Sequence, residues 1–195
     1  MVEQIEWTPK AHAVLDAAAA LFYARGIHAV GVDAIAAAAG VTKKTLYDRF
    51  GSKDRLVAEY LAARDRAWRE HLEARLASLP ASGDDPRARL RAVFDAAEEW
   101  AAERGGHGCA MVNAHAEIDD PAHPAYAVIV GQKAWMLDLF VGLARAADAA
   151  DPAVAGEQLL LLHEGAVVLA GMRAARAPFA NARAAADALF GRAFS

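Results

Sequence analysis

Positively charged and hydroxyl-bearing side chains gather in one short stretch, residues 40–55, of a chain whose net charge is −4. Five basic and two acidic side chains give this stretch a local net charge of +3, and it contains three of the five lysines and two of the three threonines. Basic side chains bind phosphate groups, and hydroxyl groups bond either to phosphates or to the edges of bases. This concentration of charge therefore predicts a nucleic-acid-binding surface.

Two short helices joined by a glycine turn are predicted to position these side chains. Residues 32–39 have the pattern of the first helix, and Gly40 ends it because glycine enters the left-handed region without steric cost. Thr42 is a suitable N-cap for the second helix, in which Leu46 and Phe50, four residues apart, face inward. A tight turn followed by a cationic helix is the arrangement that reads DNA in the major groove. The other interpretation of the pattern is a charged, solvated helix in an ordinary helical bundle.

The predicted DNA contacts are polar residues at exposed positions of the second helix and at the start of the next one. They are Thr42, Lys43, Lys44, Thr45, Tyr47, Arg49 and Lys53. Residues 43–45 and Tyr47 are expected to face the groove, and Thr42 and Lys53 are expected near phosphates. Because one such unit covers only a half-site, the expected partner is double-stranded DNA with a pseudo-palindromic operator, bound by a homodimer.

Residues 8–56 resemble the N-terminal DNA-binding domain of TetR-family transcriptional regulators. The matching positions are Phe22, Gly26, Ile35-Ala36, Ala39-Gly40-Val41-Thr42, Thr45-Leu46-Tyr47, Phe50, Ser52-Lys53 and Leu56. One departure is Gly31, where the family usually has Ser or Thr, so the phosphate contact of that hydroxyl is not carried over. The resemblance implies a helix-turn-helix DNA-binding domain at residues 8–52 and a helical ligand-binding and dimerisation domain at residues 53–195.

The composition of the chain predicts an all-α protein of about nine helices. Of its 195 residues, 56% are hydrophobic, alanine is abundant and β-branched residues are few, which favours helices. The longest predicted helix, residues 53–79, begins beside the DNA-binding helix and would act as a lever between two domains. A single cysteine fits a reducing cytosol. We find neither a signal peptide nor an apolar run long enough for a membrane, so the expected location is the cytoplasm, with no membrane partner.

Large aromatic and sulfur-containing side chains in the second domain predict a pocket for a small-molecule effector. The residues expected to line it are Trp100, Met111, His115, Trp135 and His163, with Asn113 and Gln132 as further polar candidates. Pockets between the helices of a bundle are lined by such apolar residues together with a few polar groups. The other interpretation is that these residues only fill the core.

An apolar segment near the C-terminus predicts the dimer contact. Residues 159–163 are apolar nearly all around the helix, so one face of that helix must be covered. Gly165 and Gly171 would allow a second helix to approach closely. The last helix offers Phe179, Leu189, Phe190 and Phe194. By resemblance, the last two long helices pair with their copies in a four-helix bundle.

No catalytic set and no cofactor motif emerges from the sequence. His107, Cys109, His115, Glu117 and His123 crowd one region, but their spacing is not that of a metal site. No serine lies in a nucleophile turn. The predicted function is a ligand-responsive transcriptional regulator, a repressor released from its operator by a small molecule, without enzymatic activity, metal or cofactor. Two rivals stay open: a regulator controlled by a protein partner or by oxidation of Cys109, and a small helical enzyme.

Overall fold

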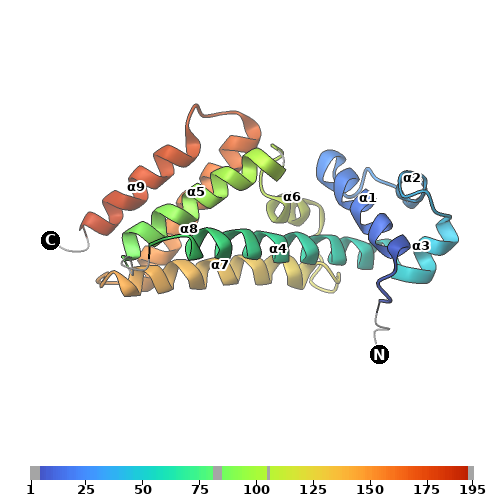
Figure 1. Ribbon diagram of the computed structural model, residues 1–195, viewed down its shortest axis with the longest axis horizontal. Helices are drawn as coiled ribbons and strands as arrows, with labels where there is room; N and C mark the ends of the chain where they lie inside the picture. Colours follow the sequence, from blue (N-terminus) through green and yellow to red (C-terminus); the bar gives the residue numbers. More distant parts are fainter. Residues whose placement is uncertain (1–4, 81–84, 105, 193–195) are drawn as a thin grey trace. The chain divides into compact units, whose positions relative to one another are not determined.

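The computed structural model describes residues 5–80, 85–104 and 106–192, and within these ranges the chain forms nine α-helices and no strand (Figure 1). The helices are α1 (Pro9–Arg25), α2 (Val32–Ala38), α3 (Lys43–Phe50), α4 (Lys53–Ala77), α5 (Pro86–Arg104), α6 (Ala110–Glu117), α7 (Tyr126–Ala146), α8 (Pro152–Met172) and α9 (Pro178–Arg192). The all-α class and the number of helices predicted from the sequence are confirmed. Phe194, predicted at the dimer contact, and the side chain of Phe190 lie outside the described part.

The chain forms two compact units, each made of separate stretches of sequence. The first unit comprises Met1–Asp65 and Ala110–Val130, and the second comprises Arg66–Cys109 and Gly131–Ser195. Helices α4 and α7 each contribute residues to both units. The predicted domains divide the chain along the sequence instead, at residue 52, and they stay a prediction.

Helices α1, α2 and α3 pack around an apolar core in the first unit. The hydroxyl of Thr8 caps α1 by accepting a hydrogen bond from the N–H of Ala11 at 3.3 Å, and Phe22 lies on the buried face of α1. The turn between α2 and α3 contains Gly40 at φ 64°. This left-handed conformation is one that glycine adopts without a Cβ clash, so the turn has the geometry predicted for it.

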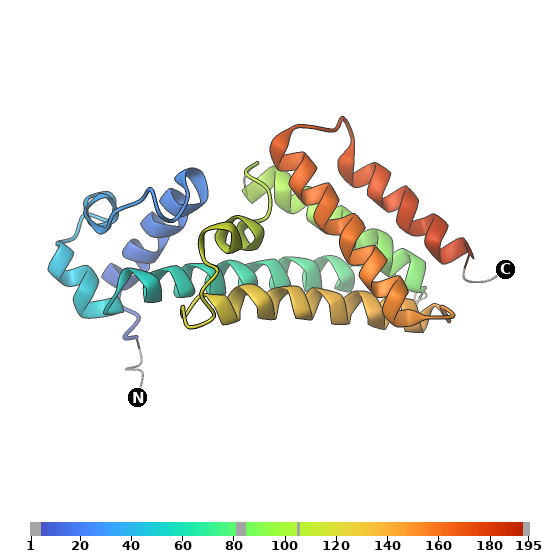
Figure 2. The same ribbon diagram turned by 180° about the vertical axis from the view of Figure 1, so that it is seen from behind.

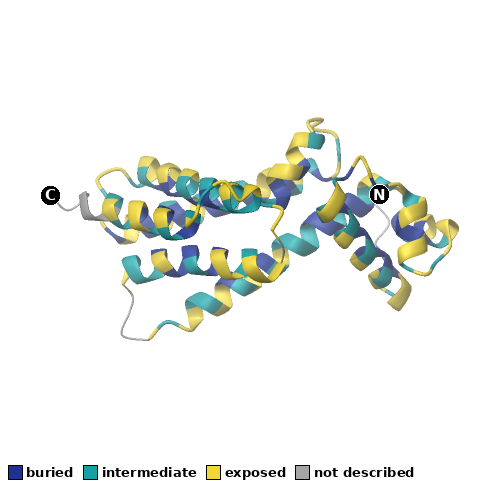
Figure 3. Cartoon of the chain, turned by 90° about the horizontal axis from the view of Figure 1, so that it is seen from above, coloured by how far each residue is buried: buried dark blue, intermediate teal, exposed yellow. Residues whose placement is uncertain are grey.

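Helix α4 starts in the first unit, which α6 and the start of α7 complete. The hydroxyl of Ser52 accepts a hydrogen bond from the N–H of Arg55 at 3.0 Å and so caps the start of α4. Met111 and Ile129, from α6 and α7, are buried. Buried positions alternate with exposed ones along the helices of this unit (Figure 3).

The second unit has a separate apolar core. Its largest fully buried side chains are Leu72, Leu90, Phe94, Met136, Phe140 and Leu159, which come from α4, α5, α7 and α8. Helix α8 packs along α9, and both contact α5 (Figure 2). An ion pair joins α5 to α9, since Nε of Arg91 lies 3.0 and 2.9 Å from the two carboxylate oxygens of Asp187.

Gly171 on α8 shows a second use of glycine, in close packing within the unit. A Cβ at this position would lie 2.3 Å from the backbone nitrogen of Gly108, a distance that no side chain tolerates. A Cβ at Gly165, by contrast, would meet no described atom within 4 Å. Of the two glycines predicted to admit a second helix, only Gly165 therefore leaves open space on the surface.

Helices α7 and α8 are long and apolar enough to cross a membrane by length and composition alone. The expectation that the chain has no such apolar run is therefore wrong by that criterion. Core helices of soluble proteins pass the same test, so the finding is weak evidence for a membrane span. In α8, Gly156, Leu159, His163 and Ala166 are buried inside the second unit.

Candidate nucleic-acid interface

Helix α3, which we call the recognition helix, presents one polar face and one apolar face. Leu46 and Phe50 are fully buried and fix the helix on the core of the first unit. Thr42 caps it, because its hydroxyl accepts a hydrogen bond from the N–H of Thr45 at 3.1 Å. The two threonine hydroxyls also lie 2.9 Å apart. Capping and burial together hold the polar face rigidly, as groove recognition requires.

Five of the predicted DNA contacts lie together at the start and on the polar face of this helix. They are Thr42, Lys43, Lys44, Thr45 and Tyr47, of which Thr45 is half-buried and the other four are exposed. Lys44 is the most open of the lysines here, with 83% of its side chain exposed. This surface offers two ammonium groups, two aliphatic hydroxyls and a phenol within two turns of helix. Such groups can bond to both phosphates and base edges.

Arg49 and Lys53, the remaining predicted contacts, are engaged inside the first unit. Nη1 of Arg49 lies 2.5 Å from a carboxylate oxygen of Glu6, and only 29% of its side chain is exposed. Nζ of Lys53 donates a hydrogen bond to the carbonyl oxygen of Ile27 at 2.6 Å and lies 5.9 Å from the ring centroid of Phe22. Lys53 therefore connects α4 to the end of α1, and its predicted phosphate contact stays a prediction.

Sequence reasoning missed the carboxylates that surround the recognition helix. Asp33 on α2 bonds to Lys43 at 3.1 Å, and Asp48 bonds to Lys44 at 2.7 Å. The spacing of Lys44 and Asp48, four residues apart on one helix, was a signal that could have revealed the second pair. The pairs with Asp33 and with Glu6 depend on tertiary structure, and no local sequence pattern predicts them.

Glu117, at the end of α6, holds the turn that follows α1. Its carboxylate accepts hydrogen bonds from the N–H groups of Ile27 at 2.8 Å and His28 at 2.6 Å. His28 also lies with Nδ1 3.3 Å from the same carboxylate. Inside the first unit, α6 is therefore bonded directly to the chain that connects α1 and α2. Glu117 belongs to the crowded region at residues 107–123, and these hydrogen bonds were not predicted from the sequence.

The five predicted effector contacts are divided between the two units. Met111 and His115 belong to the first unit, where the ring of His115 lies 6.1 Å from that of Tyr126. Trp100, Trp135 and His163 belong to the second unit. Their assignment to one pocket stays a prediction.

Within the second unit, Trp100 and His163 both contact Trp68, at ring-centroid distances of 5.7 and 6.1 Å. Trp135 packs against the apolar core of the same unit, and the guanidinium carbon of Arg69 lies 4.2 Å from the centroid of its ring. The structure thus brings Trp100 and His163 together around Trp68, another aromatic residue of the second unit.

A chain of bonded polar side chains runs through the second unit beside this aromatic cluster. Nζ of Lys133 lies 2.8 Å from Oε1 of Glu164 and 3.2 Å from Sγ of Cys109. Nδ1 of His163 lies 3.3 Å from the same Oε1. Lys133 and Glu164 are mostly covered, with 25% and 20% of their side chains exposed. Sequence reasoning missed both residues, because neither belongs to a motif.

The pKa values of this pair are shifted in opposite directions. Burial by itself raises the pKa of Glu164, but the hydrogen bond from His163 and the charge of Lys133 outweigh burial and lower the pKa from 4.5 to about 2. Burial lowers the pKa of Lys133, whereas the attraction of Cys109 and Glu164 outweighs it and raises the pKa above 10.5. Both side chains are therefore charged at neutral pH.

Three buried polar atoms in or beside this group of side chains have no hydrogen-bond partner among the described residues. They are Oε1 of Gln132, Nε2 of His163 and Oε2 of Glu164, and Gln132 and His163 are only 7% and 5% exposed. Nδ1 of His163 faces the carboxylate of Glu164, so Nε2 is the ring nitrogen left without a partner. Buried polar atoms without partners are energetically costly, so they are candidate contacts for a ligand.

The histidines, the cysteine and the acidic side chains provide no metal site in the described part of the chain. No three of them are placed so that they could hold one ion. His123 lies 3.5 Å from Asp54, and His115 contacts Tyr126. The crowded region at residues 107–123 serves packing and ion pairing instead.

An all-helical chain with a capped, cationic recognition helix behind a glycine turn defines the class of helix-turn-helix regulators. Residues 14–60 match the family described as bacterial regulatory proteins, tetR family. A TetR-family transcriptional regulator from Streptomyces coelicolor is 32% identical, with 96% of this chain and 97% of that chain covered and a TM-score of 0.85. A TetR-type regulator from Streptomyces avermitilis is 34% identical, with 93% and 99% covered and a TM-score of 0.73. The chain belongs to the TetR family.

Curated relatives match less than half of the chain. The transcriptional repressor KstR2 of Rhodococcus jostii is 40% identical over 86 residues, and the transcriptional activator FasR of Mycolicibacterium smegmatis is 41% identical over 83 residues. These matches cover 44% and 43% of this chain, but only 40% and 36% of the relatives. The family is one of DNA-binding transcriptional regulators and not of enzymes, so the rival reading as a small helical enzyme is set aside.

Proposed function

We propose that this regulator is a cytoplasmic homodimeric repressor that leaves a pseudo-palindromic operator when it binds a small molecule. The observation that carries the proposal is the polar face of the recognition helix, where Lys43, Lys44 and Tyr47 are exposed beside a capped helix start. The similarity to the repressor KstR2 supports repression, and the similarity to the activator FasR makes the sign of regulation a point for experiment. A footprint of the purified protein on the DNA upstream of its own gene tests both operator binding and operator symmetry.

Lys44 is the side chain whose replacement tests the DNA contacts. We expect Lys44→Ala to weaken operator binding by about 1–3 kcal/mol if Lys44 reads a base. If it touches only a phosphate, the slope of log K against log salt should become shallower by roughly 1. Fluorescence anisotropy with operator DNA at several salt concentrations measures both quantities. Unchanged affinity and slope in the folded variant would remove Lys44 from the interface.

An apolar hollow between α8 and α9 supports the proposed homodimer. It has a volume of about 500 Å³ and is lined by Gln158, Leu161, Leu162, Ala185, Ala188 and Leu189. Leu161 and Met172, on the same helix, are 72% and 69% exposed. A second copy of these two helices would cover this surface and complete the two half-sites that a symmetric operator needs.

The unpartnered buried atoms of Gln132 and His163 support a small-molecule effector in the second unit. They lie on the same helices as the charged pair of Lys133 and Glu164. An apolar molecule that carries one or two polar groups would satisfy such atoms. Helices α4 and α7 run through both units, so a ligand that prefers one arrangement of these helices would change the operator affinity by its differential binding.

Trp135 and His163 provide the test of this effector site. In Trp135→Ala and in His163→Ala, we expect intact operator affinity and a weaker response to the inducer. If Trp135 is only packed core, its removal costs roughly 3–5 kcal/mol of stability, and the folded fraction should respond normally. Operator release is titrated with inducer at a temperature where both variants are folded. A normal response in both variants would contradict the assignment.

Control by oxidation of Cys109 is a second candidate, favoured by the contact between its sulfur and the ammonium of Lys133 at 3.2 Å. A neighbouring cation stabilises a thiolate, which is the form that oxidants attack. Cys109 is partly exposed. The same assay of operator release, run with peroxide in place of inducer, separates the two candidates. Only control by oxidation requires a thiol at position 109.

A further inference from the structure

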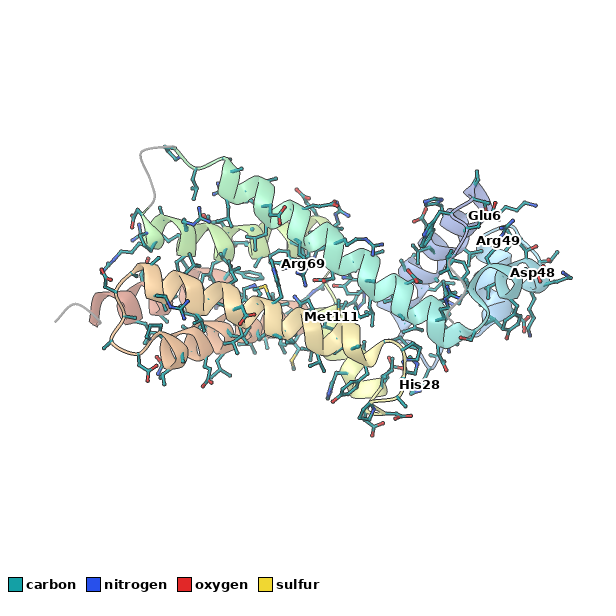
Figure 4. The ribbon with its side chains drawn as sticks, turned by 90° about the horizontal axis from the view of Figure 1, so that it is seen from below. Glu6, His28, Asp48, Arg49, Arg69 and Met111 are labelled. Carbon is teal, nitrogen blue, oxygen red and sulfur yellow. The ribbon has the colours of Figure 1, made fainter. Side chains whose placement is uncertain are left out.

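Every basic side chain of the recognition helix is bonded to a carboxylate. Lys43 pairs with Asp33 at 3.1 Å, Lys44 pairs with Asp48 at 2.7 Å, and Arg49 pairs with Glu6 at 2.5 Å. The three carboxylates come from α2, from the recognition helix itself and from the segment that precedes α1. Figure 4 shows Glu6 beside Arg49, with Asp48 on the same helix as Arg49.

These pairs leave the recognition helix with little net charge toward an approaching DNA molecule. Three cations face three carboxylates, and the carboxylates are well exposed, at 78% for Asp33, 55% for Asp48 and 76% for Glu6. Exposed ion pairs contribute only about 0.2–1 kcal/mol to stability. Their larger effect should therefore be on the ligand, because each carboxylate both occupies a cation and repels a phosphate.

We propose that Asp33, Asp48 and Glu6 raise the specificity of DNA binding by competing with phosphates for the cations of the recognition helix. The proposal rests on the DNA contacts assigned to this helix under the proposed function. Binding to DNA of arbitrary sequence comes almost entirely from phosphate contacts. A competing carboxylate therefore weakens the main source of non-specific affinity. On the operator, contacts to base edges remain and fix each lysine next to one phosphate, so the same competition costs a smaller share of the affinity.

Asp48→Asn tests the proposal, because the amide keeps the size of the side chain and removes its charge. Affinities are measured by anisotropy for an operator fragment and for a random-sequence fragment of equal length, between about 50 and 200 mM salt. We expect binding to random DNA to become about tenfold tighter and its salt slope to steepen by about 0.9 as one lysine becomes free to neutralise a phosphate. The operator affinity should rise less, so the ratio of specific to non-specific affinity should fall. Asp33→Asn should act in the same way through Lys43.

Glu73→Gln is the matched control, since Glu73 is exposed on α4 and its replacement changes the net charge by the same amount. Glu73→Gln should change neither the ratio of specific to non-specific affinity nor the salt slope on random DNA. The proposal is overturned if Glu73→Gln reproduces the effect, or if Asp48→Asn strengthens both complexes equally. It is also overturned if Asp48→Asn loses operator affinity alone, because Asp48 would then accept a bond from a cytosine amino group.

If the unsubstituted protein binds its upstream DNA no more tightly than random DNA, the proposed operator is wrong. In that case the salt slope on random DNA still tests whether the carboxylates compete with phosphates. If the slope is the same for the wild-type protein and for Asp48→Asn, the proposed competition is overturned.

Discussion

Leu161→Arg should convert the protein into a monomer with operator affinity reduced by roughly 100-fold or more. Leu161 is 72% exposed on α8 and lines the apolar hollow between α8 and α9. A charge there would be buried without a partner in a dimer, a cost of several kcal/mol, whereas in a monomer it stays in water. Loss of the second half-site removes a large share of the roughly 10³–10⁷-fold advantage of a specific site over other DNA.

Sedimentation velocity and operator titration of the same samples measure the two effects together. Val130→Arg is the control, because Val130 is also an exposed apolar residue, 45% accessible, on a helix outside the proposed contact. It should remain dimeric and bind the operator normally. A folded, dimeric Leu161→Arg with normal operator affinity would show that another surface makes the dimer.

Helix α3 and the turn before it were predictable because their signals are local. Glycine at position 40, threonine at position 42 and the spacing of Leu46 and Phe50 each act within a few residues of the chain. The structure confirms the turn conformation at Gly40, the cap at Thr42 and the burial of both apolar side chains. The location of these elements therefore follows from the sequence alone.

The partners of the charged side chains were not predictable in the same way. Glu6 and Arg49 are 43 residues apart, and Ile27 and Glu117 are 90 apart. Such pairs form only after the helices have packed, and surface carboxylates are too common for one partner to be chosen from sequence. Exposure was not predictable within residues 159–163 either, because periodicity does not say whether Leu160 or Leu161 is the more exposed. The structure packs Leu160 partly against the core and leaves Leu161 exposed.

Glu164→Gln should destabilise the second unit by about 3 kcal/mol at neutral pH, at the low end of the effect of breaking a buried ion pair. The amide would leave the ammonium of Lys133 charged and three-quarters covered, still in contact with the sulfur of Cys109. Glu103→Gln is the control, because Glu103 is exposed and the variant removes one negative charge at the surface. Urea unfolding followed by circular dichroism gives the free energies. Restoration of much of the loss in Lys133→Met/Glu164→Gln would identify the unpaired ammonium as the cause.

The pH dependence of the same difference provides an independent test. The pKa of Glu164 is about 2 in the folded protein against an ordinary value of 4.5, so the unfolded chain binds this proton more tightly. The stabilisation from the ionised carboxylate is therefore fully present above pH 4.5 and is lost as the pH falls toward 2, by about 3 kcal/mol in total. The stability of the wild-type protein minus that of Glu164→Gln should shrink across that window and stay constant between pH 6 and 8. If the wild-type protein and Glu164→Gln are equally stable at neutral pH, Lys133 and Glu164 contribute no net stabilisation. The proposed role of these polar side chains would then be limited to effector binding.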